Sequence, residues 1–213
     1  TGLVRLGIVP SVAAHLLPAA LQRALAVSPD IRVRVVEGSG DQMIAAVLRG
    51  EVDFAVVGQP SDAMEDTVAL TPLGYEEVCV AAGANHPVLS REGLTMADLR
   101  DHPWALPEKG NVIWYGFRAM FQKAGLEPPV PTVSTNSVHV LKSMVVSGAF
   151  LTMLTRVIFA VEESQGLMAP VPLAGAHWNR RLAIARRPSG SVLPAARLVM
   201  RELQAVGAEL SVA

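Results

Sequence analysis

The sequence predicts an α/β protein made of two lobes. Residues 3–58 have the pattern strand, helix, strand, helix, strand, and near residues 78–82 the chain leaves this set for a second one. Residues 182–187 have the pattern of a strand that returns to the first set. The predicted division places residues 1–80 and 184–213 in lobe I and residues 81–183 in lobe II. A cleft between two such lobes would suit a small molecule.

Lobe I is predicted as three strands joined by two helices. Its strands are short runs of apolar and β-branched residues, and proline, glycine and polar residues interrupt them. Strands joined by a helix within one sheet are parallel, and their connection is right-handed. The expected elements are a strand at 3–9, a helix up to about residue 27 with Pro18 in its first regular turn, a strand at 31–37, a helix capped by Asp41 and ended by Gly50, and a strand at 52–57.

Lobe II repeats the alternation with shorter segments. Glycines at the predicted helix ends and polar residues at the helix starts mark the boundaries. The expected elements are an extended crossing segment at 73–82, a helix at 94–99, a strand at 104–106, a helix at 111–124, a strand at 130–135, a helix from 138 to Gly148, a strand at 150–154, a helix at 156–164, strands at 168–173 and 182–185, and a closing helix at 193–206.

The amino-acid composition limits the functions that this chain can have. The 213 residues are 51% apolar and 17% charged, which predicts a well-buried core. The net charge of −1 argues against this chain binding nucleic acid by itself, because phosphate binding needs a basic face. No apolar run approaches the roughly 18 residues of a membrane helix, so no membrane partner is expected. The single cysteine, Cys79, lies in an apolar run and is expected to be a buried, inert thiol in a reducing compartment.

No catalytic, metal or cofactor motif is found. The five histidines are scattered without ligand spacing. There is no G-x-S-x-G, no phosphate loop and no dinucleotide fingerprint. The sequence therefore predicts no catalytic residue, no metal and no cofactor, although a triad assembled across the fold stays an alternative.

Two predicted helix starts are candidate binding positions. Ser11 and Val12 follow the first strand, and Thr135, Asn136 and Ser137 follow a strand of lobe II. Helix starts offer unpaired N–H groups and a partial positive charge, which suit a carboxylate or another anion. Ordinary helix capping is the alternative interpretation.

Weaker candidates lie on one loop and the helix after it. Lys109 and Asn111 could meet an anion or simply belong to a solvated loop. Trp114 and Tyr115 could line the cleft or belong to the core. Arg156, at a predicted helix start, indicates either an anionic partner or a surface salt bridge.

The whole chain resembles the effector-binding domain of LysR-type transcriptional regulators. The stretch RGEVDFAVV is the most specific, since this family typically has G-x-L/V-D-x-A-I/V there. The segments that carry the resemblance are VRLGIVPSVAAHLLP at 4–18, IRVRVVEGSGDQMIAAVLRGEVDFAVV at 31–57, HP at 86–87, LTMADLRDHPWAL at 94–106 and VVSGAF at 145–150.

The resemblance implies a type 2 periplasmic-binding-protein-like fold, with two Rossmann-like lobes joined by two crossing strands. It implies a small, often acidic effector between the lobes, held at Ser11 and Val12, the loop near 107–111 and the helix start at 135–137. Phe150 stands where the family often has a second glycine, and Thr155 stands where a proline often occurs. Both substitutions bear on the pocket.

The resemblance also implies partners beyond the effector. Family members carry a winged helix-turn-helix ahead of this domain, so DNA contact is expected only through that N-terminal domain. A homodimer or homotetramer in the cytoplasm is expected. The leading interpretation is thus an effector sensor of a transcription regulator, and the alternatives are a solute-binding protein of a transport system and a two-lobed enzyme.

Overall fold

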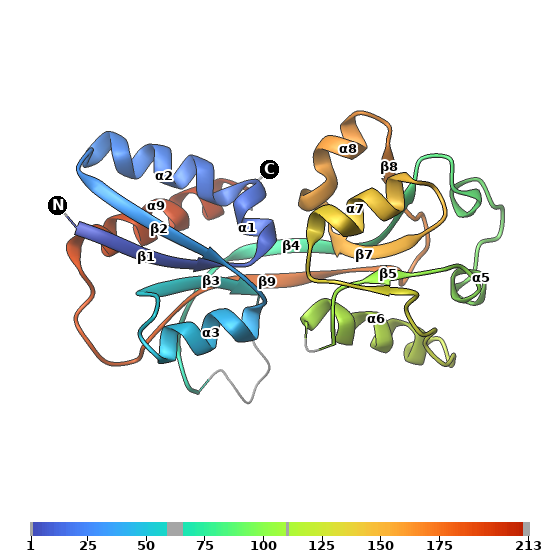
Figure 1. Cartoon of the computed structure of the whole chain (residues 1–213), viewed down its shortest axis with the longest axis horizontal. Helices are drawn as coiled ribbons and strands as arrows, with labels where there is room; N and C mark the ends of the chain where they lie inside the picture. Colours follow the sequence, from blue (N-terminus) through green and yellow to red (C-terminus); the bar gives the residue numbers. More distant parts are fainter. Residues whose placement is uncertain (1, 59–65, 110, 211–213) are drawn as a thin grey trace. The chain divides into compact units, whose positions relative to one another are not determined.

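The chain folds into two compact units, seen in a computed structural model that describes residues 2–58, 66–109 and 111–210 (Figure 1). Unit 1 comprises Thr1–Glu76 and Arg180–Ala213, and unit 2 comprises Glu77–Asn179. The units therefore divide at residues 76 and 179, whereas the predicted lobes divide at 80 and 183. Two strands, β4 (Ala69–Gly83) and β9 (His177–Arg186), each run from one unit into the other.

Unit 1 is a sheet covered by helices on both faces. β1 (Gly2–Ile8) pairs in parallel with both β2 (Ile31–Glu37) and β3 (Phe54–Gly58), and β3 pairs with β9 in antiparallel fashion. The returning strand predicted near residues 182–187 is thus confirmed. Figure 1 shows α2 (Leu16–Val27) and α9 (Pro194–Leu210) on one face and α3 (Gly40–Leu48) on the other. One apolar core fills this unit.

The first predicted helix is broken in two. α1 (Pro10–Ala14) ends at His15, which has φ −142° and ψ −45°, and α2 follows directly. A proline lacks the N–H that a helix interior needs, and its ring clashes with the carbonyl four residues earlier. Pro18 would therefore disturb a continuous helix at Ala14, and the break places Pro18 in the first turn of α2, as predicted.

Helix α3 begins two residues earlier than the predicted cap implies. Ser39 is the N-cap: its side chain accepts from the Gln42 backbone N–H, and the Gln42 side chain accepts from the Ser39 N–H. The prediction of Asp41 as the cap was wrong because this reciprocal capping box satisfies two backbone donors at once. Gly50 follows the helix with φ +72°, the left-handed conformation that favours glycine at a helix end.

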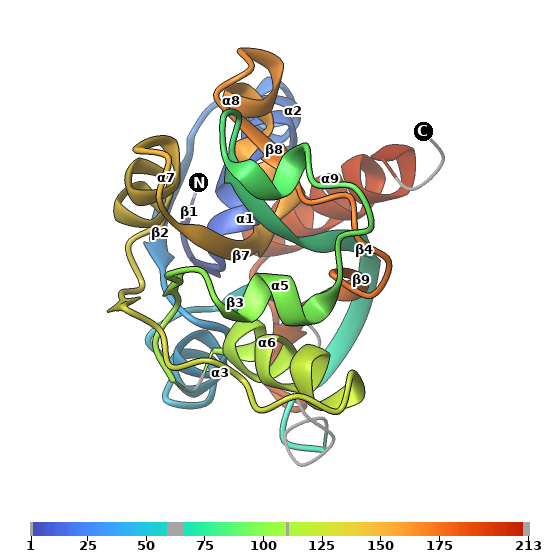
Figure 2. The ribbon, with the colours of Figure 1, turned by 90° about the vertical axis from the view of Figure 1, so that its right-hand side faces the viewer.

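Unit 2 contains two short parallel strands, β5 (Ala105–Leu106) and β6 (Val133–Ser134). Its part of β4 pairs in antiparallel fashion with β7 (Leu151–Thr155) and β8 (Met168–Pro170). In Figure 2, α6 (Val112–Lys123) lies below β7 and α8 (Ala160–Ser164) above it. The helical elements of the described part of unit 2 are η1 (Pro87–Leu89), α5 (Met96–Arg100), α6 (Val112–Lys123), α7 (Val138–Val146), η2 (Arg156–Phe159) and α8 (Ala160–Ser164).

Prolines shorten two of the predicted strands. The strand expected at 130–135 is only Val133–Ser134, and the strand expected at 168–173 ends at Pro170. Proline cannot donate to a strand ladder, and Pro131 and Pro172 lie within the missing parts. An aromatic core lies beside β5. Trp104 is fully buried there and packs edge-to-face on Phe117 at a centroid distance of 4.8 Å.

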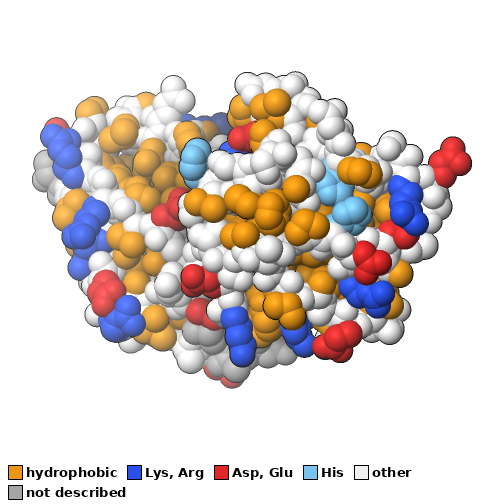
Figure 3. All heavy atoms as spheres, turned by 45° about the vertical axis from the view of Figure 1, so that its right-hand side comes forward, with side chains coloured by type: hydrophobic (Ala, Val, Ile, Leu, Met, Phe, Trp, Pro, Cys, Tyr) orange, Lys and Arg blue, Asp and Glu red, His pale blue; other side chains and the backbone are white. Residues whose placement is uncertain are grey.

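The surface has no single-sign patch on the face drawn in Figure 3, where acidic and basic side chains are interspersed. This agrees with the net charge of −1. Among the described residues, no helix is both long enough and apolar enough to cross a bilayer.

Candidate functional site

The carboxyl ends of parallel strands define one candidate edge in each unit, because ligands of open α/β sheets bind at those ends. In unit 1 this edge follows β1 and β3, where Ser11 and Gly58 lie. In unit 2 it follows β5 and β6, where residues 107–109, Asn111 and residues 135–137 lie. Seven of the eight predicted ligand residues fall on these two edges; Phe150 does not.

The unit 1 edge contains a buried polar cluster of Ser11, Glu76 and Arg180. The Ser11 hydroxyl donates to Glu76 Oε2 at 3.0 Å. Arg180 donates to the same oxygen through Nε at 3.1 Å and Nη2 at 2.9 Å, and Nη2 also reaches Ser11 Oγ at 3.1 Å. Ser11 is fully buried, and the side chains of Glu76 and Arg180 are only 3% and 10% exposed.

This cluster is unusual in its bonding. All three donors meet at Oε2, while the other carboxylate oxygen of Glu76, Oε1, is buried and has no hydrogen-bond partner. Buried ions are normally paired and hydrogen-bonded because their desolvation is costly. Glu76 and Arg180 are paired as ions, but Glu76 Oε1 accepts no hydrogen bond.

Sequence reasoning missed Glu76 and Arg180. Both sit inside strands that the sequence identifies only by apolar runs, and 104 residues separate them. A signal was present: Glu76 and Arg180 each begin a charged pair, EE at 76–77 and RR at 180–181, directly before an apolar run. A charge at the entry of a buried strand indicates a specific partner or a functional position.

Val12 offers no free donor in this arrangement. Its side chain is buried in the unit 1 core, and its backbone N–H donates to the Val9 carbonyl at 3.0 Å. Helix α1 has only five residues, so its dipole is small. The assignment of Val12 as a ligand residue stays a prediction.

The unit 2 edge brings together two loops that are 28 residues apart. The Asn136 side chain accepts from the Glu108 N–H at 3.3 Å and donates to Glu108 Oε2 at 3.1 Å. These bonds join the loop after β5 to the loop after β6. Lys109 lies exposed on the first loop. The structure therefore places Lys109, Asn111, Thr135, Asn136 and Ser137 at a single edge.

Side chains cap both helices that begin at this edge, α6 and α7. Asn111 Oδ1 accepts from the Ile113 N–H at 3.0 Å at the start of α6. Ser137 Oγ accepts from the Val140 N–H at 3.3 Å at the start of α7, and Thr135 Oγ1 accepts from the Ser137 N–H at 3.1 Å. The caps orient polar groups at the edge and leave the Ser137 hydroxyl hydrogen available to a ligand oxygen.

Two cations flank the indole of Trp114. Lys109 Nζ lies 6.0 Å from the ring centroid and Arg118 Cζ lies 5.2 Å from it, both within the range of a cation–π contact. Trp114 is half-buried and Tyr115 is 54% exposed, so neither is a fully buried core residue. These contacts hold Lys109 near α6.

Phe150 and Thr155 lie at opposite ends of β7. Phe150 precedes the strand and packs half-buried against the core beside α7. Because Leu151 bridges to Trp104 in parallel fashion, the carboxyl end of β7 corresponds to the end of β5 that carries the candidate edge. Thr155 is at that end, and its hydroxyl is buried without a hydrogen-bond partner. Phe150 as a ligand residue stays a prediction, and Thr155 is better placed.

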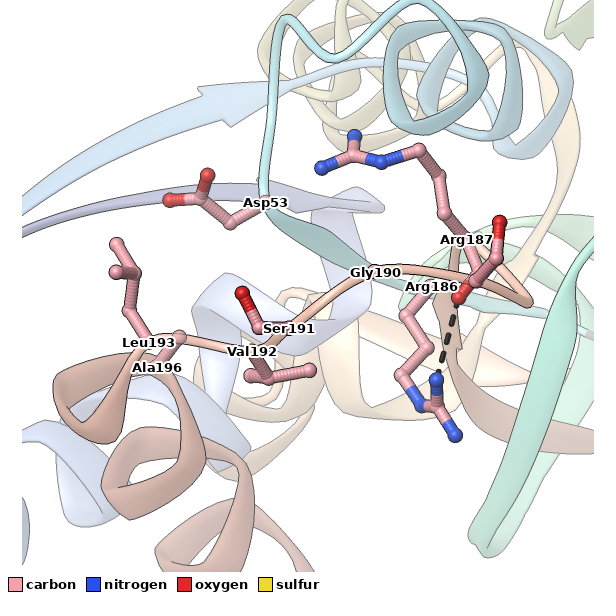
Figure 4. A pocket seen from close by; sticks show the side chains of 9 residues that line it. Asp53, Arg186, Arg187, Gly190, Ser191, Val192, Leu193 and Ala196 are labelled. Carbon is pink, nitrogen blue, oxygen red and sulfur yellow. Dashed lines mark hydrogen bonds between the residues drawn. The ribbon is translucent and has the colours of Figure 1, made fainter.

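A small pocket of about 50 Å³ lies elsewhere in unit 1 (Figure 4). Asp53, Arg186, Arg187 and the loop leading into α9 line it. Asp53 precedes β3, so this pocket is at the amino end of the parallel strands, opposite to Ser11. Arg187 also donates to the Val47 carbonyl at the end of α3, at 2.8 Å. Organic ligands occupy sites of about 300 Å³ or more, so this pocket suits only a few water molecules.

The remaining charged candidates have structural explanations. Arg156 forms ion pairs with Glu77 at 3.2 Å and Glu163 at 2.7 Å, and these hydrogen bonds raise the pKa of its guanidinium. The surface salt bridge predicted as the alternative for Arg156 is thus what the structure shows. Cys79 is buried as predicted, and this burial raises the pKa of its thiol to about 12, which is the direction expected for an unreactive thiol. Over the described ranges, no group of three or more His, Cys, Asp or Glu is placed to hold a metal ion.

Comparison with known proteins identifies the family of this chain. The family model described as LysR substrate binding domain matches residues 1–208, and the chain belongs to this family. The match confirms the resemblance and the α/β fold class predicted from the sequence. It gives no support to a solute-binding protein of a transport system.

The individual relatives and solved structures described next share 30% or less of their residues with this chain. The chain is 30% identical over 200 residues to the HTH-type transcriptional regulator GalR of Pseudomonas putida, covering 93% of this chain and 50% of that protein. The chain thus spans about half the length of this relative. The CcmR regulatory domain of Synechocystis PCC6803, solved with 2-PG, has a TM-score of 0.86 at 17% identity and covers 97% of this chain and 98% of that one. The effector-binding domain of QuiR, solved with shikimate, has a TM-score of 0.83 at 15% identity, with 98% of both chains covered.

Proposed function

We propose that this chain senses a small, acidic organic effector for a LysR-type regulator and passes the signal to a DNA-binding domain ahead of it. The effector is held by the unit 1 edge at Ser11 and the unit 2 edge at Lys109, Asn111 and residues 135–137. The regulator is a cytoplasmic homodimer or homotetramer, and only its N-terminal domain contacts DNA. The chain itself catalyses no reaction.

The observation that carries this proposal is the pair of polar edges at the carboxyl ends of the parallel strands. Both edges use donors: the Ser11 hydroxyl and Arg180 guanidinium in unit 1, and the Ser137 hydroxyl, Lys109 ammonium and Asn111 amide in unit 2. Donors and cations suit a carboxylate. The structural neighbour QuiR is solved with shikimate, a hydroxylated carboxylic acid, which is a ligand of this class.

The signal follows from a difference in affinity between two arrangements of the chain. A ligand shifts a conformational equilibrium only by as much as it prefers one state over the other. A tenfold preference corresponds to about 1.4 kcal/mol, which a few additional hydrogen bonds provide. The two crossing strands, β4 and β9, are the covalent route by which such a change passes between units.

A thiol-based redox response is disfavoured as a second function. Cys79 is the sole cysteine of the chain, so no resolving partner exists within it. Its burial and raised pKa keep the sulfur protonated, whereas redox-sensing cysteines are accessible thiolates.

The test is a thermal-shift screen of small organic acids on the purified chain, followed by calorimetry with the best ligand. Ser137→Ala removes the edge hydroxyl, and we expect it to weaken binding at least about tenfold, the lower end of the range for one hydrogen bond to a charged group. Ser143→Ala is the matched control, because Ser143 is an exposed serine on the same helix, α7. Equal affinity in Ser137→Ala and Ser143→Ala, or no acid that binds, would contradict the proposal.

A further inference from the structure

We infer that the Ser11 hydroxyl and the Arg180 guanidinium form an anion site that the Glu76 carboxylate occupies from within, and that the acidic group of the effector takes its place. This inference rests on the proposed function and assigns its regulation to a named contact. Glu76 thereby becomes a specificity-determining residue: it competes with acidic ligands and with no others.

The donor geometry is that of an anion site. Three donors, Ser11 Oγ and the Nε and Nη2 atoms of Arg180, bond to the single oxygen Oε2 of Glu76. The donor–acceptor distances are 2.9–3.1 Å. The hydroxyl is itself held by Arg180 Nη2 at 3.1 Å, so the two donors are fixed relative to each other. Guanidinium and hydroxyl groups arranged in this way bind carboxylates and phosphates generally.

Glu76 fills this site imperfectly. Arginine and carboxylate groups pair best as two parallel hydrogen bonds that use both oxygens. Here both bonds from Arg180 go to Oε2, and Oε1 is buried without a partner. The backbone of β4 constrains the Glu76 side chain, whereas the carboxylate of a free ligand can rotate so that both of its oxygens are bonded.

The site lies where a ligand is expected. Ser11 follows β1, and Arg180 lies over Gly58 at the end of β3: a Cβ atom on Gly58 would be 3.2 Å from Arg180 Nη1. The bare glycine backbone therefore leaves room for the guanidinium at the carboxyl ends of β1 and β3.

The same contact involves both crossing strands. Glu76 is the last residue of unit 1 before β4 enters unit 2, and Arg180 is the first residue of unit 1 after β9 returns. The Glu76–Arg180 ion pair thus joins the two crossings on the unit 1 side. An acid that takes over Arg180 breaks this link, which gives the effector a direct effect on the segments that connect the units.

Chemical rescue tests the anion site. Glu76→Ala removes a CH₂–COO⁻ fragment, which is nearly an acetate ion, so acetate is the probe and acetamide is its neutral control. At constant ionic strength, we expect acetate to bind Glu76→Ala at least tenfold more tightly than wild type and to raise its melting temperature. Acetamide should do neither, and Glu76→Ala/Arg180→Met should not respond to acetate.

The results that would overturn the inference are equally definite. An equal acetate response in wild type and Glu76→Ala, an acetamide response as large as the acetate response, or an unchanged response in the double variant would each refute the site. If Glu76→Ala is unfolded in acetate-free buffer, recovery of its folded circular-dichroism spectrum in acetate, but not in acetamide, is the expected result. Failure to recover would count against the inference.

Displacement by the effector is tested with the acid found in the screen. It should bind Glu76→Gln at least tenfold more tightly than wild type, because the glutamine leaves Arg180 without its internal counter-ion. Unchanged or weaker binding to Glu76→Gln would refute displacement and leave the proposed function intact. If no acid binds wild type, the proposed function fails, and the acetate experiment still decides whether the anion site exists.

Discussion

The two candidate edges follow the same rule of sheet topology and differ in chemistry. The unit 1 edge is buried and pairs its charges internally through Glu76 and Arg180. The unit 2 edge is exposed, and its polar residues cap helices or bridge two loops, as Asn136 does with Glu108. Substitutions at the unit 1 edge should therefore alter stability and binding together, whereas substitutions at the unit 2 edge should alter mainly binding.

The largest expected effect comes from breaking the buried ion pair. Arg180→Met leaves the Glu76 carboxylate buried and uncompensated, and removal of one partner of a buried pair costs about 3–5 kcal/mol. The matched control is Arg201→Met at the Arg201–Glu202 pair, where the arginine is 65% exposed and the expected loss is at most about 1 kcal/mol. Urea unfolding of both variants measures the difference. Similar losses in the two would mean that the cluster in unit 1 is not the stabilising contact described.

A smaller loss of stability is expected from overpacking between α6 and β9. Gly116 lies on α6, and a Cβ atom there would come within 2.3 Å of Trp178 Cζ2. Gly116→Ala should destabilise the protein by about 1–3 kcal/mol through overpacking, despite the better helix propensity of alanine. Gly40→Ala is the control, since no atom lies within 4 Å of its Cβ position at the start of α3. Thermal unfolding that shows no loss for Gly116→Ala would contradict the close packing of Trp178.

A pH-dependent effect on stability is expected at His86 in unit 2. Burial, and then the neighbouring His102, lower the pKa of His86 below its usual value of 6.5, against a backbone hydrogen bond with Ala149 that raises it. The folded state therefore favours neutral His86, and the unfolded state takes up a proton first as the pH falls. Stability from this residue should be full above about pH 6.5 and decline below it.

The comparison for that effect is His86→Asn, whose amide oxygen can still accept from the Val88 N–H. The drop in unfolding free energy between pH 7.5 and 5.5 should be smaller in His86→Asn than in wild type. His139→Asn, at an exposed position on α7, should retain the wild-type drop. Identical drops in all three proteins would remove His86 as the cause.

The smallest effect on stability is expected at the exposed edge. Asn136→Ala loses the two bonds to Glu108, and because both residues are exposed we expect a change within about 0.5 kcal/mol. Binding of the acid identified by the screen should nevertheless weaken severalfold, since the loop that carries Lys109 loses its anchor. Gln122→Ala, an exposed change on α6, should alter neither quantity. A loss of stability with intact binding in Asn136→Ala would reverse the contrast between the edges.

The elements of unit 1 were predictable because each strand is a separate apolar or alternating run bounded by proline, glycine or polar residues. The break at His15 was missed, since it depends on how Pro18 meets the carbonyl of Ala14, which a pattern of apolar residues does not reveal. In unit 2, prolines shorten strands that residue patterns alone extend, as at Pro131.

The candidate edges were predictable from topology, because residues after parallel strands meet at one edge whatever their identity. The pairing within an edge was not. Asn136 finds Glu108 across 28 residues, and Glu76 finds Arg180 across 104. Such pairs depend on which strands become neighbours, and a single sequence contains no record of that.

The open edge of β2 in unit 1 affects how readily copies of the protein associate edge to edge. Among the described strands, β2 stands at the end of the strand order, so one of its sides presents backbone groups that could bond to a strand of another molecule. Its outward residues include Arg32 and Arg34, both exposed. If the open edges of two β2 strands paired in parallel and in register, arginine would face arginine at about 4.8 Å, and this repulsion disfavours such a pairing.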